Sequence, residues 1–258
     1  MYVRAMAYGE TRQAQIVRAL RSAEAVSVAD LSRALGASEV TIRRDLAELE
    51  QAGVLRRVRG GAVSAMLRGE GLPFAMRELE RAEAKARIAE AAVARISDGE
   101  SVVLDGGTTG SAAARCLTQR RLTVVPLALS EFGSLASAPG VSLLLPGGTV
   151  CAGESSLVGP MTEQNLAQLR LDTMLLTCCG FDPRRGVTAY DLGDAAVKRA
   201  AMAASARTIA MVDSSKFART AMAVVCPTTA VDMVITDVDA PEDVVAALRA
   251  DGIEVHCV

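Results

Sequence analysis

Apolar residues recur at helical spacing in the first part of the chain and predict three helices. These lie over residues 11–22, 27–36 and 39–52. Serines precede the second and third helices and glycines follow them, as expected of N-caps and helix stops: Ser27, Ser38, Gly36 and Gly53. Asp30, three residues after Ser27, completes a motif that resembles a capping box. This order of helices, with a short glycine-containing turn, predicts a helix-turn-helix.

The third helix has two distinct sides when its residues are rotated by about 100° each. The side predicted to face inward carries Ile42, Leu46 and Leu49. The opposite side carries Val40, Arg44 and Ala47, with Thr41 and Arg43 on the flanks. Arginine can bridge guanine O6 and N7, threonine can read or touch a base edge, and small residues let a helix sit deep in the major groove. Asp45 and Glu48 would repel phosphate, so we expect them to pair with arginines or to face away.

The sequence VLRRVRGGAV, residues 54–63, predicts a short β-ribbon with its turn at Gly60-Gly61. A basic ribbon beside a recognition helix is a wing, which is suited to gripping the phosphate backbone. The residues predicted to contact DNA are Ser38, Thr41, Arg43, Arg44, Arg56, Arg57 and Arg59. The alternative is a solvated, arginine-rich surface that binds nothing.

The charge distribution favours the DNA-binding interpretation. The chain has 258 residues and a formal net charge of −2, yet residues 1–68 hold 11 arginines against 7 acidic residues. A basic head on an acidic body suggests that the head meets a polyanion. A membrane span needs about 20 consecutive apolar residues, and no apolar run of the chain approaches that length. The N-terminus also lacks the apolar core of a signal peptide, so we expect a cytoplasmic protein. The only histidine is His256 and the six cysteines form no CxxC pair, so neither a metal site nor a cofactor is predicted.

The rest of the chain predicts an α/β domain. A helix is predicted over 75–96, after a polar segment punctuated by glycine and proline. Strands are predicted at 101–105, 122–128, 141–145, 171–177, 207–213, 222–226, 231–236 and 253–257. Helices fit near 109–118, 130–138, 160–169, 192–206 and 241–250. The alternation implies a mostly parallel sheet with helices on both faces. The expected domains are 1–66 for the head, 67–73 for a linker and 74–258 for the body.

Four loops at predicted strand ends are candidates for a ligand site, because ligands of such sheets bind at the carboxyl ends of strands. They are LDGGTTG (104–110), LPGGTV (145–150), CCGFDPRRGVT (178–188) and VDSSKF (212–217). Glycine-rich turns before helices favour anions, and lysines are reasonable partners. The candidate effector residues are Asp105, Gly106, Gly107, Thr108, Thr109, Gly147, Gly148, Gly180, Asp182, Lys198 and Lys216. Each feature has a simpler explanation, since a Gly-Gly turn is often only a tight turn and a mid-helix lysine is usually solvated. Together the loops predict a small polar pocket for a phosphate and several hydroxyls, such as a phosphorylated sugar.

The segment VSVADLSRALGASEVTIRRDLAELEQAGVLRRVRGGA resembles the winged helix-turn-helix of the DeoR family of bacterial transcriptional regulators, with TIRRDL as its most specific part. The later motifs VVLDGGTT, LLLPGG, CGFD, GVT, AAVKRAAM and DSSKF are similar, in order, to the DeoR sensor domain. The resemblance covers the chain from about Arg12 onward. It implies a sensor domain similar in fold to ribose-5-phosphate isomerase and the CoA-transferases, which senses sugar phosphates or related metabolites. It also implies an operator-binding repressor of a sugar or related catabolic operon, released by its effector.

Two departures from the family pattern bear on the effector. Pro126, Leu127 and Ala128 stand where the family usually carries Thr-Asn-Ser, and Cys178-Cys179 replaces Gly-Ala. Losing polar side chains at a pocket changes which hydroxyls can be bound, so we expect an effector other than a common hexose or pentose phosphate. A homodimer or homotetramer is expected, because two heads would grip two half-sites. The alternatives are a sugar-phosphate isomerase-like enzyme with an ancillary head, for which Asp105, Asp182 and Asp191 are the available bases, and a purely architectural DNA binder.

Overall fold

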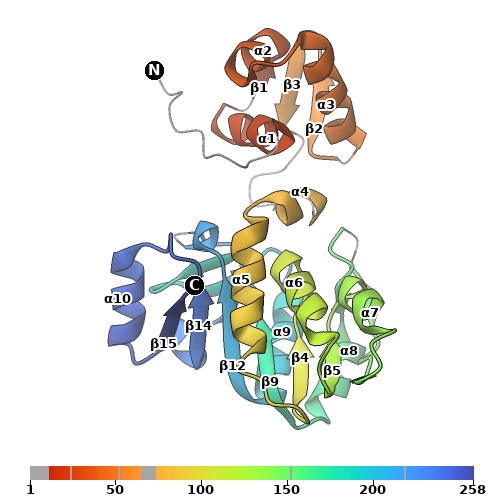
Figure 1. Ribbon diagram of the computed structural model, residues 1–258, viewed down its shortest axis with the longest axis vertical. Coiled ribbons are helices and arrows are strands. Elements are labelled where there is room, and N and C mark those ends of the chain that lie inside the picture. The colour runs from red at the N-terminus through yellow and green to blue at the C-terminus, as the bar shows by residue number, and fades with distance from the viewer. Residues whose placement is uncertain (1–11, 24, 52, 65–73, 152, 218) are drawn as a thin grey trace. The chain divides into compact units, whose positions relative to one another are not determined.

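The computed structural model divides the chain into two compact units, Met1–Arg81 and Ala82–Val258, and Figure 1 traces both. It describes residues 12–23, 25–51, 53–64, 74–151, 153–217 and 219–258. Each unit has its own hydrophobic core, so each is considered by itself.

The first unit is a winged helix-turn-helix. Its main helices are α1 (Arg12–Ser22), α2 (Val28–Leu35) and α3 (Glu39–Gln51). Its strands are β1 (Ala25–Ser27), β2 (Leu55–Val58) and β3 (Gly61–Ser64), which form an antiparallel sheet in the order β1-β3-β2. The three predicted helices are confirmed, whereas β1 is too short to show in the sequence pattern.

The predicted helix ends are confirmed by their geometry. The Oγ atom of Ser27 accepts a hydrogen bond from the backbone N–H of Asp30 at 3.0 Å, and the backbone N–H of Thr41 donates to Ser38 Oγ at 3.2 Å. Gly36 ends α2 in the left-handed conformation, with φ at 62°. The inward residues of α3 are buried together with side chains of α1, α2 and β2, in a cluster that includes Ile42, Leu46, Leu49, Ile16, Leu31 and Leu55. The sequence therefore placed α3 with the correct side inward.

The turn of the wing differs by one residue from the prediction. Val58 pairs with Gly61, so the turn consists of Arg59 and Gly60 rather than Gly60 and Gly61. Gly60 takes a positive φ of 83°. Gly61 has another reason to be glycine, because a Cβ atom there would lie 2.0 Å from the carbonyl oxygen of Val26. The absence of a side chain is what lets β1 pair closely with β3.

The single helix predicted over 75–96 is wrong. The structure has α4 (Phe74–Leu79) and α5 (Ala82–Val93), separated at Arg81, which takes a φ of 53°. A residue in the left-handed region cannot continue the helix, so the run of helix-forming residues is interrupted there. The pattern of Ala, Arg and Glu carries no signal for this break.

The second unit is built on a seven-stranded parallel sheet in the order β15-β14-β12-β9-β4-β5-β6 (Figure 1). These strands are β4 (Ser101–Leu104), β5 (Leu122–Pro126), β6 (Val141–Leu143), β9 (Leu171–Leu176), β12 (Ser205–Val212), β14 (Met233–Thr236) and β15 (Glu254–Cys257). The remaining helices are α6 (Thr108–Leu117), α7 (Leu129–Leu135), α8 (Pro160–Ala167), α9 (Leu192–Ala204) and α10 (Glu242–Ala250). Seven of the eight predicted strands are in this sheet, which confirms the predicted α/β class.

Alternate residues of each strand enter two different cores. On β4, Val102 and Leu104 pack with α5 and α6, and Val103 packs on the opposite face with α8 and α9. This two-sided burial explains why the strands are almost entirely apolar in sequence. The sheet is therefore a middle layer between two layers of helices.

Two smaller antiparallel sheets complete the second unit. The predicted strand 222–226 forms β13 (Ala223–Cys226), but it pairs in the order β10-β11-β13 with β10 (Gly180–Asp182) and β11 (Gly186–Ala189), not with the parallel sheet. β7 (Thr149–Val150) pairs with β8 (Leu157–Val158). These four partner strands of two to four residues were not predicted. Across the described residues, every helix is too short or too polar to cross a membrane.

Candidate DNA-binding surface and effector site

The outward side of α3 is polar, basic and open to solvent. The side chain of Arg44 is 81% exposed, and Arg43, Ser38 and Val40 are also exposed. Thr41 is half-buried, and its hydroxyl forms a hydrogen bond of 2.8 Å with the Ser38 hydroxyl. This side of the helix has the residue types that major-groove recognition uses.

The arginines of α3 are paired within the helix. Arg43 donates to Glu39 at 2.8 Å and Arg44 to Glu48 at 3.2 Å, both four residues apart. Exposed pairs of this kind stabilise a helix only slightly. The pairs hold both guanidinium groups along the surface of α3, each against a glutamate. Another anion would have to replace that glutamate in order to bind the arginine.

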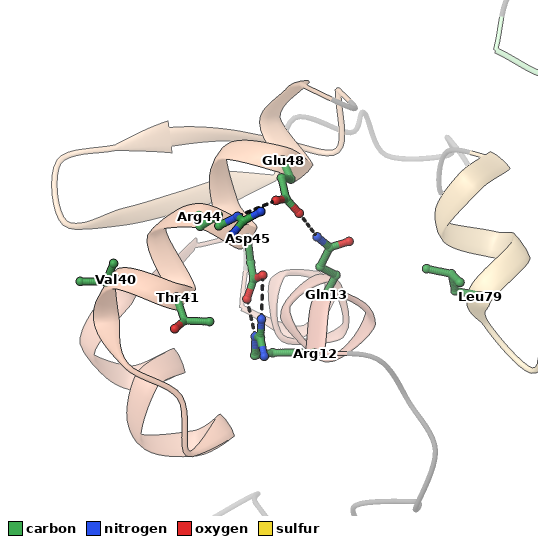
Figure 2. A pocket seen from close by; sticks show the side chains of 8 residues that line it. All are labelled: Arg12, Gln13, Val40, Thr41, Arg44, Asp45, Glu48 and Leu79. Atoms are coloured by element: carbon green, nitrogen blue, oxygen red, sulfur yellow. Dashed lines mark hydrogen bonds and ion pairs between the residues drawn. The ribbon is translucent and has the colours of Figure 1, made fainter.

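The two acidic residues of concern, Asp45 and Glu48, are both partnered, as expected. Asp45 is buried and accepts two hydrogen bonds from the Arg12 guanidinium, the longer one at 3.0 Å. Both residues of this pair line a groove of about 550 Å³ bordered by α1, α3 and Leu79 of α4. Figure 2 shows the pair and the hydrogen bond that Gln13 Nε2 donates to Glu48, at 2.7 Å. The pair joins the start of α1 to the middle of α3 and thereby fixes the angle of the recognition helix.

A second groove, of about 310 Å³, lies between α3 and the wing. Three arginines are among the residues that line it, namely Arg43, Arg57 and Arg59. Glu50 joins its two sides, because its carboxylate accepts from the backbone N–H of Arg57 at 2.8 Å and from Arg57 Nε at 2.6 Å. These bonds lower the pKa of Glu50. Arg56 and Arg59 are exposed and have no ion pair within the described part of the chain.

The second unit has a topological switch point between β4 and β9. The chain passes from β4 to β5 and β6 on one side, and then returns to β9 on the other. Ligands of open α/β sheets bind in the crevice outside the carboxyl ends of the strands at such a point. The residues that follow the two strands are Asp105-Gly106-Gly107 and Thr177-Cys178. Two of the four predicted loops, 104–110 after β4 and 178–188 after β9, therefore lie at the position that the topology favours.

The loop after β4 leads directly into α6. The N-cap of α6 is Gly107, at a φ of 91°, which has no side chain to offer to the first N–H groups of the helix. Thr108 and Thr109 are buried in its first turn. Gly110 allows a close approach, because a Cβ atom there would lie 2.1 Å from the carbonyl oxygen of Asp105. An uncapped helix start beside two threonine hydroxyls has the donors that bind an anion.

Asp105 is a buried junction between the sheet and α9. Its carboxylate accepts from the Thr177 N–H at 2.8 Å and the Thr177 hydroxyl at 2.9 Å, and it forms a short ion pair with Lys198 Nζ. Lys198 Nζ also lies 3.5 Å from Asp194. Burial opposes the charge of Lys198, but the two carboxylates outweigh it and raise the pKa of the ammonium group. Lys198 is thus a buried, paired residue and not the solvated one of the simpler explanation.

Sequence reasoning missed three members of this polar cluster. Thr177 is the last residue of the strand predicted at 171–177, although β9 itself ends at Leu176. Asp194 lies four residues before Lys198, a spacing that places both on one side of a helix. Glu131 gave no signal. It is fully buried and accepts hydrogen bonds from the hydroxyls of Ser111 at 2.8 Å and Ser130 at 2.7 Å, and burial raises its pKa.

The two departures from the family pattern lie at this site. A Cβ atom at Gly106 would be 3.1 Å from the Ala128 Cβ, so the apolar segment after β5 borders the glycine loop. Cys178 and Cys179 follow β9, and burial raises the pKa of both thiols. Phe217 forms a parallel β-bridge with Phe181, which places Lys216 near the loop that follows β9. Lys216 itself is half-buried.

Other predicted effector residues have evident structural roles. Gly147 and Gly148 lie against α8, where Thr162 Oγ1 donates to the Gly147 carbonyl oxygen at 2.8 Å. Gly180 begins β10, and a Cβ atom there would lie 2.3 Å from the Arg219 carbonyl oxygen. Asp182 closes the β10–β11 hairpin, because its Oδ1 atom accepts from the next two N–H groups of the turn at 2.8 and 2.9 Å.

The two units together define a class of protein, a regulator with a winged helix-turn-helix and an α/β sensor. Two family models match the chain: the DeoR-like helix-turn-helix domain over residues 12–66 and the DeoR C-terminal sensor domain over residues 80–238. The chain belongs to the DeoR family, and it is a metabolite-responsive DNA-binding regulator of transcription.

Relatives match over nearly the whole chain. A protein of Escherichia coli O157:H7, which carries the name of an aga operon transcriptional repressor, is 35% identical over 95% of this chain and 92% of its own. The transcriptional repressor AccR of Agrobacterium fabrum is 34% identical over 88% and 89%. The glycerol-3-phosphate regulon repressor of Escherichia coli K12 is 29% identical over 93% and 96%. A ribose-5-phosphate isomerase structure from Methanocaldococcus jannaschii aligns with 54% of this chain and 55% of that chain, at a TM-score of 0.41 and 14% identity. Similarity at that level bears on neither substrate nor activity.

Proposed function

We propose that the chain represses a sugar or related catabolic operon by binding double-stranded operator DNA through α3 and the wing. A phosphorylated or otherwise anionic metabolite at the β4–β9 switch point releases it. The observation that carries the DNA-binding part is the exposure of Arg43 and Arg44 on α3 beside Arg56, Arg57 and Arg59 on the wing. Ser38 and Thr41 belong to the same face. The names of the relatives support repression.

In this proposal the two arginine groups have different tasks. Arg44 enters the major groove and contacts a base edge, whereas Arg57 and Arg59, which line the groove between α3 and the wing, contact the phosphate backbone. An arginine that contacts a base changes sequence preference. An arginine that contacts phosphate changes affinity for all sequences and its dependence on salt.

The effector site is proposed to centre on the loop Gly106-Gly107 and the start of α6. Thr108 and Thr109 supply hydroxyls, and the free N–H groups of the first turn face an anion. Lys198 is already neutralised by Asp105 and Asp194, so it holds the loop in position and does not bind the anion directly. Lys216, which has no ion pair in the described part of the chain, is the better cationic partner for the ligand. Gly147, Gly148, Gly180 and Asp182 shape the surrounding loops.

The absence of catalytic activity is also proposed, on the basis of the three available carboxylates. Asp105 is engaged by Lys198 and Thr177, Asp182 by the hairpin turn, and Asp191 by the N–H of Asp194 at 2.8 Å. In all three the carboxylate is already used to hold part of the fold in place, which argues against the role of a general base that must reach the substrate. The names of the relatives agree, since they are regulators.

Two measurements test the proposal. Fluorescence anisotropy with duplexes enriched from a random library should show tight binding that weakens as salt increases. Thermal-shift screening with sugar phosphates, and with the same sugars lacking phosphate, should show stabilisation by phosphorylated ligands, which should also dissociate the DNA complex. A response to uncharged ligands alone would contradict the anion site. Turnover of a sugar phosphate in an isomerase assay would contradict the non-catalytic assignment.

The assembly is proposed to be a homodimer or homotetramer. A symmetric pair of heads can bind two half-sites about one helical turn apart, and an effector that favours another arrangement of the pair would release the DNA. Sedimentation of the protein with and without DNA tests this. A monomer that binds the enriched duplex with full affinity would exclude it.

A further inference from the structure

Val40 is the most exposed large hydrophobic side chain in the described part of the chain. It is 75% exposed, compared with 72% for Met222, the next in order. Single exposed apolar residues are normal on protein surfaces. What distinguishes Val40 is its position on the second residue of α3, in the turn of a recognition helix that meets base edges first.

The polar groups around Val40 are already engaged with one another. The Glu39 carboxylate accepts from Arg43, and the hydroxyls of Ser38 and Thr41 bond at 2.8 Å. Val40 therefore presents two methyl groups to solvent from a turn whose neighbouring polar groups have local partners. Figure 2 shows its side chain directed away from α1.

Val40 and Arg44 are four residues apart and so lie on one side of the helix. The separation along the axis is about 6 Å, which equals roughly two steps of the about 3.4 Å between stacked bases. A helix that brings Arg44 to one base therefore brings Val40 to another base about two pairs away.

We propose that Val40 selects a thymine by contact with its 5-methyl group in the major groove, about two base pairs from the base that Arg44 contacts. The inference rests on the proposed DNA-binding function and adds to it a residue that determines sequence preference. Thymine is the one base with an apolar group on its major-groove edge. The other bases present hydrogen-bond donors and acceptors at this edge. Contact with valine would remove water from these atoms without replacing the lost hydrogen bonds.

The test removes one methyl group from the DNA. The full chain is used to enrich duplexes from a random 30-base-pair library, and each thymine in the best duplex is then replaced by deoxyuridine, which lacks only the 5-methyl group. We expect a loss of affinity of about fourfold at one thymine in each half-site, which corresponds to about 0.8 kcal/mol for one buried methyl group.

The protein variants complete a double-mutant cycle. Val40→Ala should bind the thymine and deoxyuridine duplexes equally, because the contact is gone from the protein side. Val238→Ala is the matched control, since Val238 is a valine of the second unit with 69% exposure and its variant should keep the fourfold difference. Circular dichroism establishes that both variants are folded.

The outcomes separate the two proposals. If no duplex is enriched, the proposed DNA-binding function is wrong and this inference falls with it. If a duplex is bound but no thymine responds to loss of its methyl group, or if Val40→Ala keeps the response, the assignment of Val40 alone is wrong.

Discussion

Replacing Lys198 with methionine isolates the contribution of the buried cluster at the switch point. The substitution keeps the length of the side chain and removes its charge, so the buried carboxylate of Asp105 loses its counter-charge and Asp194 loses a neighbour at 3.5 Å. Removing one partner of a buried ion pair typically costs about 3–5 kcal/mol. Asp105 still accepts two hydrogen bonds from Thr177, which places the expected loss in the lower half of that range.

The measurement must report on the second unit alone, because the first unit has its own core and contains no residue of this cluster. Native-state hydrogen exchange of amides in β4 and β9 gives that free energy directly. Lys216→Met is the control, since Lys216 is half-buried and has no ion pair in the described part of the chain. It should cost less than about 1 kcal/mol, as most partly exposed substitutions do.

A second variant tests the cause of the loss. Adding Asp105→Asn to Lys198→Met removes the uncompensated charge and keeps an oxygen that can accept from Thr177. It should therefore recover at least half of the lost stability. If Lys198→Met costs no more than Lys216→Met, or if the double variant is less stable than the single one, the pair is not the buried junction described above.

The remaining predictions concern the first unit. Arg44→Ala should lose about 1–3 kcal/mol of operator affinity, and Arg59→Ala should weaken binding to all sequences and lower the salt slope by about one. Anisotropy titrations across salt concentrations distinguish the two variants, and equal behaviour would contradict the assignment of Arg44 to a base contact. The bonds that lower the pKa of Glu50 stabilise the wing above the usual carboxyl range and are lost as the pH falls below it. The chemical shift of the Arg57 amide should therefore change with pH in the acid range. The same amide should show no such change in Glu50→Gln. Gly61→Ala should lower the melting temperature of the first unit, because its Cβ would lie 2.0 Å from a carbonyl oxygen of β1. Gly133→Ala is the control, because Gly133 of α7 has open space for a Cβ atom and its variant should not lower the melting temperature.

Most of the secondary structure followed from the sequence because the periodicity was strong. The inward stripe of α3 and the apolar strands buried on both faces gave direct signals, and Ser27, Ser38 and Gly36 marked helix ends. The break at Arg81 gave none, since Arg favours helices and only the backbone conformation reveals it. The short strands β7, β8, β10 and β11 depend on partners distant in sequence, which periodicity cannot supply.

The candidate site was predictable where polar residues and glycines follow directly after a strand. It was not predictable where a residue's role depends on its burial. The loop after β4 was found because glycines and threonines followed an apolar run. The sequence could not show that Lys198 is buried against Asp105, because the position of a lysine on a helix does not reveal whether its side chain is solvated or enclosed. Glu131 was missed for the same reason, since its burial arises from the packing of α6 against α7.

The glutamates paired with the arginines of α3 have a consequence for how the head discriminates between DNA sequences. When Arg43 or Arg44 turns to DNA, it exchanges one anionic partner for another, and Glu39 or Glu48 is left close to the negative backbone. The exchange gives a net gain only where a guanine edge offers the guanidinium two acceptors at once. Arg56 and Arg59 face no such exchange and are attracted to any duplex. In the proposed complex, the acidic residues of α3 would therefore disfavour sequences without such a guanine, while the arginines of the wing would hold the protein on DNA of any sequence.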